Sequence, residues 1–89
     1  MAVVHFASAL QSHCPAPPLT VEGMTVGAAL SAAFLHYPKL KSYVLDDQGA
    51  VRKHVAIFLD GETIEDREHL TDRIVLRGEI FVMQALSGG

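Results

Sequence analysis

The sequence ends in Gly88-Gly89, and this pair is the part of the chain best suited to chemistry. Glycine has no Cβ, so two glycines in succession leave the terminal carboxylate on a thin arm that can enter a narrow site on another protein. Fully extended, the segment from Gln84 to Gly89 reaches roughly 20 Å. A carboxylate presented in this way can be activated by a partner's catalytic groups. The alternative is an end without a role, because chain termini are often loosely held.

The rest of the chain has no residue pattern typical of an active site. Gly23 and Gly27 fit neither of the glycine patterns that bind nucleotides. Cys14 is the only cysteine, so it forms no internal disulfide, and it has no basic neighbour to make it a nucleophile. The histidines lack the tight spacing of metal ligands, and they are His5, His13, His36, His54 and His69. We therefore expect no metal site and no bound cofactor.

Composition indicates one small globular domain. The chain has 89 residues, of which 49% are hydrophobic, and a net charge of −3. It contains no block of Lys and Arg, so nucleic-acid binding is not expected. No apolar run approaches the ~20 residues of a membrane span, and residues 1–9 lack the basic region of a signal peptide. A single cysteine suits the reducing cytoplasm, where we expect the protein to be found.

The first half of the sequence predicts two strands and a helix. Residues 3–7 and 19–22 are expected strands, separated by a proline-rich loop over 11–18. Thr25 is a suitable N-cap, and Pro38 should end the helix that follows it. One helical stripe is formed by Val26, Ala29, Leu30, Ala33, Phe34 and Tyr37.

The second half predicts a short helical turn over 40–45 and then mainly strands. A strand is expected over 54–59, and Asp60-Gly61 is a strong hairpin-turn signal after it. A short return strand over 62–64 and a final strand over 80–83 complete the set.

This order predicts an α+β fold with a mixed sheet of four or five strands packed on one main helix. The first and last strands should run parallel at the centre of the sheet, which is the β-grasp, or ubiquitin-like, arrangement. The domain is expected over residues 1–84, followed by a flexible tail over 85–89 that carries the two glycines.

A partner-binding surface is predicted on the sheet face away from the helix. In the strand over 54–59, alternation puts Val55 and Ile57 on one face and Phe58 on the other. In the last strand it separates Ile80 and Val82 from a second pair, Phe81 and Met83. If the aliphatic residues face the helix, then Phe58, Phe81 and Met83 form an exposed apolar patch. The alternative to a partner protein is that a loop or a second copy of the chain covers this patch.

Several segments resemble the ThiS/MoaD family of ubiquitin-like sulfur carriers. The resemblance extends over nearly the whole chain and is carried by residues 19–30, 37–40, 51–62 and Ser87-Gly88-Gly89. The family often has Gly-Asp-Glu before its last strand, where this sequence has Arg77-Gly78-Glu79. Small subunits of molybdopterin synthase usually carry prolines before the tail, where this sequence has Gln84-Ala85-Leu86. Thiamine, molybdenum cofactor, cysteine, a sulfur-containing secondary metabolite and thiolated tRNA all remain possible destinations of the sulfur.

The resemblance implies that the protein is a carrier and not an enzyme by itself. A ubiquitin-activating-like enzyme would use ATP to adenylate the carboxylate of Gly89, and a sulfur donor would then convert it to a thiocarboxylate. Gly88 would allow the tail to extend in the partner's channel, and Ser87 and Leu86 would be held there. A sulfur-accepting synthase subunit would take the sulfur.

Three alternatives stay open. The same activated tail could join the protein to lysines of other proteins, as a ubiquitin-like modifier. The chain could instead be the small subunit of a two-protein sulfur-transfer enzyme, or a β-grasp binding module that does not use its tail.

Overall fold

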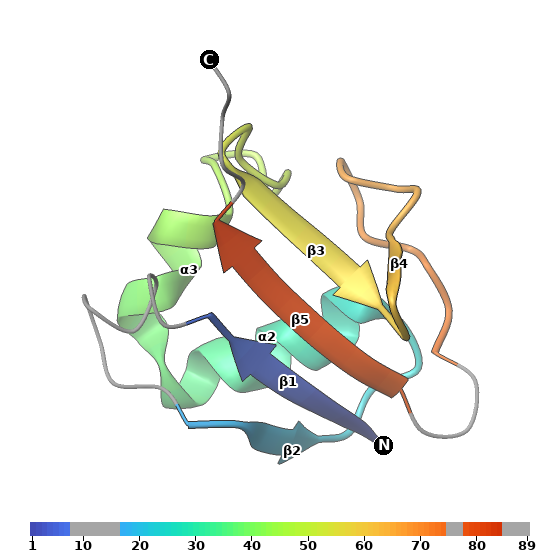
Figure 1. Cartoon of the computed structure of the whole chain (residues 1–89). Helices are drawn as coiled ribbons and strands as arrows, with labels where there is room; N and C mark the ends of the chain where they lie inside the picture. Colours follow the sequence, from blue (N-terminus) through green and yellow to red (C-terminus); the bar gives the residue numbers. More distant parts are fainter. Residues whose placement is uncertain (8–16, 75–77, 85–89) are drawn as a thin grey trace.

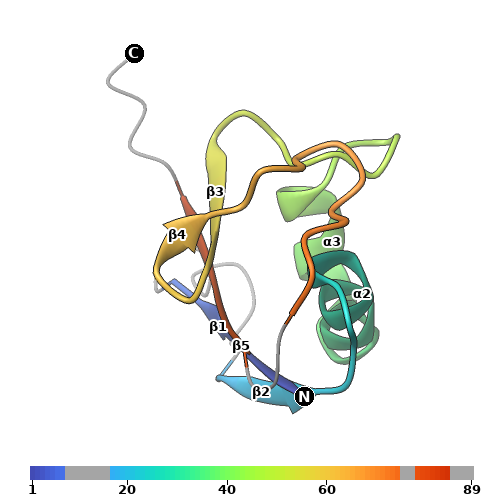
Figure 2. The same ribbon diagram turned by 90° about the vertical axis from the view of Figure 1, so that its right-hand side faces the viewer.

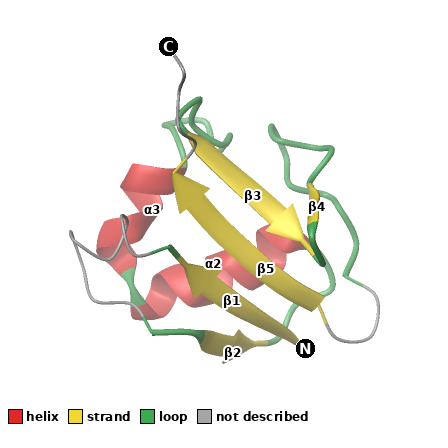
Figure 3. Cartoon of the chain, in the orientation of Figure 1, coloured by secondary structure: helices red, strands yellow, loops and turns green. Residues whose placement is uncertain are grey.

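In the described part of the chain, a five-stranded mixed sheet carries two helices on one of its faces (Figures 1 and 2). The computed structural model describes residues 1–7, 17–74 and 78–84. The strands are β1 (Ala2–Phe6), β2 (Leu19–Val21), β3 (Val55–Leu59), β4 (Glu62–Thr63) and β5 (Gly78–Gln84). Their order in the sheet is β2-β1-β5-β3-β4, with β1 and β5 parallel and every other neighbouring pair antiparallel. This is the predicted β-grasp arrangement (Figure 3).

Alternation along the central strands fills the core. Ala2, Val4 and Phe6 of β1 are all buried, as are Ile80 and Val82 of β5. The parallel register sets Val4 beside Ile80 and Phe6 beside Val82, so large apolar side chains meet on the helix side of the sheet. The predicted inward face of the final strand is therefore confirmed.

Helix α2 (Val26–His36) is the main helix that the sequence predicts. The Oγ1 atom of Thr25 accepts a hydrogen bond from the Ala28 backbone N–H at 3.1 Å, which makes Thr25 the N-cap. The predicted stripe packs against the sheet, with Val26, Ala29, Leu30, Ala33 and Phe34 all buried.

Helix α3 (Pro38–Val44) is a helix of 7 residues that begins two residues before the short helical turn predicted over 40–45. Pro38 does end α2, but it also occupies the first turn of α3. A proline is suited to that place because its missing N–H would have no partner in the first turn. Leu40 and Val44 are fully buried, so α3 contributes its own side chains to the core.

The β3–β4 hairpin turns at Asp60-Gly61, as predicted. Both residues have positive φ, 52° for Asp60 and 91° for Gly61, which is typical of a two-residue turn of type I′. Leu59 and Glu62 are the last paired residues on either side of the turn.

The carboxylate of Asp66 accepts several of the hydrogen bonds that hold the segment after β4. Asp66 accepts hydrogen bonds from the backbone N–H groups of Glu68 and His69 and from both the N–H and the hydroxyl of Thr71. These hydrogen bonds lower the pKa of Asp66 from 3.8 to about 2. The Thr71 hydroxyl has the largest effect, and the His69 N–H has the next largest.

This loop also packs on the start of α2. The backbone N–H of Gly27 donates to the carbonyl of Leu70, and that of Val26 donates to the carbonyl of Asp72, both at 2.9 Å. These bonds satisfy donors of the first helical turn that have no partner within the helix. Leu70 is buried in the core, so the loop over 65–74 is an integral part of the domain.

Candidate functional site

The candidate site is the face of the sheet turned away from α2 and α3, which we call the open face. It carries the three residues that the sequence predicts there. Phe58 of β3 lies directly across from Phe81 of β5, and Met83 lies opposite Ala56. Phe81 is 38% exposed and Met83 is 42% exposed, whereas Val82 between them on β5 is buried. The structure therefore brings Phe58, Phe81 and Met83 together as one partly exposed apolar patch.

His5 of β1 extends this patch on its other side. It is the register partner of Phe81, and the two rings stack with centroids 4.3 Å apart and planes inclined by 8°. The row across the sheet is thus His5, Phe81 and Phe58, with Phe81 in the middle. Sequence analysis missed the position of His5. The position of His5 could have been found by combining the predicted parallel pairing of the first and last strands with the alternation of residues along each.

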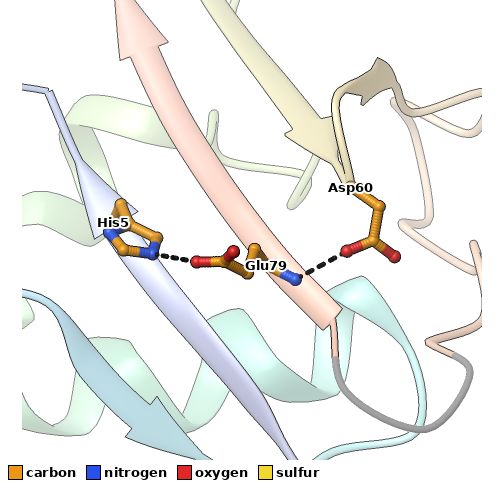
Figure 4. A network of polar contacts seen from close by, with 3 residues as sticks. All are labelled: His5, Asp60 and Glu79. Atoms are coloured by element: carbon orange, nitrogen blue, oxygen red, sulfur yellow. Dashed lines mark hydrogen bonds and ion pairs between the residues drawn. The ribbon is translucent and has the colours of Figure 1, made fainter.

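Two carboxylates border the patch at the start of β5. The Nε2 atom of His5 lies 2.9 Å from Oε1 of Glu79, whose side chain is 60% exposed. The Asp60 side chain accepts a hydrogen bond from the Glu79 backbone N–H at 2.9 Å, and the Asp60 N–H donates to the Glu79 carbonyl. The β3–β4 turn is thereby fixed to the start of β5 (Figure 4).

A hollow of 870 Å³ lies beside these carboxylates, where β1 and β5 begin. Its lining includes Val3 and Thr20 as well as Asp60 and Glu79. An apolar centre with a polar, charged rim is the usual composition of a protein-binding surface. What this arrangement can do chemically is bind another protein.

The predicted reacting residues, Gly89, Gly88, Ser87 and Leu86, lie outside the described residues. The strand that leads to them is described as far as Gln84, which is the register partner of Val55. Met83 is therefore close in sequence to the predicted tail, and the patch extends to the end of β5.

The predicted absence of metal ligands can be examined only in part, because His13 and Cys14 also lie outside the described residues. Within residues 1–7, 17–74 and 78–84, no three His, Cys, Asp or Glu side chains gather in a way that could hold a metal ion. No helix in the same part of the chain is long and apolar enough to cross a membrane.

Solved structures with the same fold cover almost all of this chain. The crystal structure of SAMP1 from Haloferax volcanii, a small archaeal modifier protein, is 25% identical and has a TM-score of 0.77, covering 99% of this chain and 98% of its own. A chain of the Amycolatopsis orientalis BexX/CysO complex is 13% identical and has a TM-score of 0.83, covering 100% of this chain and 100% of its own. CysO from Mycobacterium tuberculosis is 19% identical, with a TM-score of 0.81 over 97% of this chain and 100% of that chain.

No protein-family model matches the sequence, and no curated protein matches it. At 13% and 19% identity the two CysO structures show the shared fold alone. The likeness to SAMP1 adds a sequence identity of 25% along the full length. The chain therefore has the ubiquitin-like β-grasp fold of all three structures, and its resemblance to ubiquitin-like proteins of the ThiS/MoaD type is confirmed by the full-length likeness to SAMP1.

Proposed function

We propose that this protein is a sulfur carrier that works through the carboxylate of Gly89. The single observation that carries the proposal is the full-length β-grasp similarity to SAMP1 and CysO in a chain whose sequence ends in Gly88-Gly89. One of these neighbours was solved as a BexX/CysO complex, which supports a role carried out together with a partner protein.

The proposed chemistry begins with activation, because a carboxylate is a poor electrophile. A partner enzyme transfers AMP from ATP to a carboxylate oxygen of Gly89 and releases pyrophosphate. A sulfur nucleophile then forms a bond to the carbonyl carbon, and AMP leaves with the electron pair of its C–O bond. The product is a thiocarboxylate, which donates sulfur to an acceptor held by a synthase subunit. ATP and the catalytic groups belong to the partners, so this chain is their substrate.

The open face is the proposed contact for the activating enzyme. Phe81 and Met83 lie on β5, the strand from which residue 85 continues, and Phe58 lies on its neighbour β3. A partner that covers these side chains would also hold Gln84, after which the predicted tail begins. Glu79 and Asp60 add negative charge beside the patch, which favours a basic region on the partner.

A second candidate function is protein modification. It is favoured by the name of the structural neighbour at 25% identity, small archaeal modifier protein 1. The same acyl adenylate would then be attacked, directly or through a thioester, by a lysine amine of a target protein. An isopeptide bond would form in place of the thiocarboxylate.

Intact-mass measurement separates these functions. The protein is incubated with ATP, its activating enzyme and a sulfur donor, next to a variant that lacks Gly89. A sulfur carrier gains the mass difference between sulfur and oxygen, and the deletion variant gains nothing. A modifier instead yields adducts on lysines of other proteins that survive denaturation. If neither product forms with an activating enzyme shown to be active, the tail is not used and the binding-module function remains.

A further inference from the structure

Helix α2 is apolar over most of its circumference. In its sequence, Val-Gly-Ala-Ala-Leu-Ser-Ala-Ala-Phe-Leu-His, only Ser31 and His36 carry polar side chains. Helices of this composition are normally covered on all sides. Here one stripe packs on the sheet, whereas Leu35 on the outer side is 85% exposed. A leucine so exposed adds nothing to the core, and the outer side of α2 is uncovered within the described part of the protein.

A groove of 590 Å³ lies between α2 and α3 at this position. Phe34 and Leu45 are nearly buried and form its floor. Its other lining residues include Ala32, Leu35, Pro38 and Lys41. The groove belongs to the layer of helices and not to the open face of the sheet, which is the other layer of the molecule (Figure 2).

The helices also differ from the rest of the chain in charge. No Asp or Glu occurs between Val26 and Leu45, although the protein has ten acidic residues and a net charge of −3. The same stretch contains two lysines, Lys39 and Lys41, both exposed on α3. The groove is therefore an apolar surface with a positive edge in a protein that is otherwise negative.

We propose that this groove binds a short apolar and acidic segment of a partner protein. An apolar side chain of the segment would lie on Phe34 and Leu45 and cover Leu35, while a carboxylate would pair with Lys41. A groove between two helices can accept a segment of a partner, as in other cases where an amphipathic helix lies in an apolar groove. Two lysines are fewer than the cluster of basic residues that binding to an anionic membrane surface requires, so a protein segment is favoured over a lipid surface.

The groove and the open face lie on different layers, so two partners can bind at once (Figure 2). The activating enzyme would hold the sheet while a second protein occupies the helices. This inference goes beyond the proposed function and does not depend on it, because neither the groove nor its charge involves Gly89.

The test is selection of random peptides displayed on phage against the full-length protein, followed by affinity measurement with the selected peptides. We expect the selected peptides to combine Leu, Ile, Phe or Met with Asp or Glu. The variants Leu35→Gln and Lys41→Glu should each weaken binding by about tenfold or more. Met24→Gln and Lys53→Glu are matched controls, because they remove an exposed apolar side chain and reverse an exposed lysine elsewhere, and they should leave binding unchanged.

Several results would overturn the proposal. One is the selection of peptides that lack carboxylates, and another is the absence of any enriched peptide. A third is the selection of peptides whose affinity is unaffected by Leu35→Gln but lost in Phe81→Ala. A dimer in sedimentation experiments that Leu35→Gln dissociates would assign the groove to a second copy of the chain. Binding to phosphatidylglycerol vesicles that the same substitution abolishes would assign it to a membrane. Leu35 is exposed, so its variant should unfold at the wild-type urea concentration, which confirms that any loss of binding is local.

Discussion

Replacing Phe81 with alanine should weaken partner binding while leaving the protein folded. A phenylalanine buries about 200 Å² when it is fully covered. Because Phe81 is 38% exposed in the free protein, a partner could cover roughly 75 Å² more of it. At about 25 cal/mol per Å², that area corresponds to about 2 kcal/mol, or roughly a 25-fold loss of affinity.

The same substitution has a cost within the sheet. Alanine loses the stack with His5 and the cross-strand contact with Phe58. The part of Phe81 already covered corresponds to at most about 3 kcal/mol of folding free energy, an upper limit because the unfolded chain buries some apolar area itself. Domains are typically stable by 5–15 kcal/mol, so the variant should still be folded at 25 °C.

The assay is calorimetric titration of the protein into its activating enzyme without ATP, with stability measured in parallel by urea unfolding. Val82→Ala is the matched control, since Val82 is the next residue on β5 but is fully buried on the helix side. It should lower stability by about 2 kcal/mol and leave the affinity of the folded protein unchanged. Equal affinities for wild type and Phe81→Ala, or an equal loss in Val82→Ala, would refute the assignment of the open face.

Three further substitutions test how the site is positioned, each measured by urea unfolding. Thr25→Ala removes the N-cap of α2 and should cost about 1 kcal/mol, whereas Thr25→Ser should cost little. Gly23→Ala should cost about 1–3 kcal/mol, because a Cβ there would lie 2.7 Å from the Ala29 backbone nitrogen; an unchanged midpoint would contradict this contact. Asp66→Asn should lower stability near neutral pH. The folded-state pKa of Asp66 is lowered to about 2, so its contribution is present above pH 3.8 and is lost as the pH falls toward 2. The difference between wild type and Asp66→Asn should therefore shrink over that range, and a difference constant from pH 6 to pH 2 would exclude this role of the carboxylate.

The elements that position the open face were predictable because they depend on local patterns. The stripe beginning at Val26 and the cap at Thr25 define α2 without knowledge of the fold. Alternation along residues 80–83 assigns Phe81 and Val82 to opposite faces, and the structure agrees. The turn at Asp60-Gly61 fixes which residues of β3 and β4 are paired.

Other features depend on contacts between distant parts of the chain. The sequence predicts only a short turn in place of α3, because Pro38 indicates where α2 ends. That Pro38 also begins α3 depends on Leu40 and Val44 being buried in the core. The conformation of the loop over 65–74 depends on the hydrogen bonds that the Asp66 carboxylate accepts from backbone N–H groups. The stack of His5 on Phe81 joins the two ends of the chain, and no local pattern in either strand contains it.

Two residues of the patch, Phe81 and Met83, lie on β5, the strand that ends at Gln84 directly before the predicted tail in the sequence. β5 is the central strand of the sheet and is hydrogen-bonded to β1 on one side and to β3 on the other, so its position is fixed along both edges. Phe81 and Met83 therefore have fixed positions relative to Gln84, where the described part of the strand ends. A partner that binds the patch therefore holds Gln84, the last described residue before the predicted tail, at a defined point. Under the proposed function, changes on the open face should alter how tightly the activating enzyme binds, and changes at Gly89 should alter whether the reaction occurs.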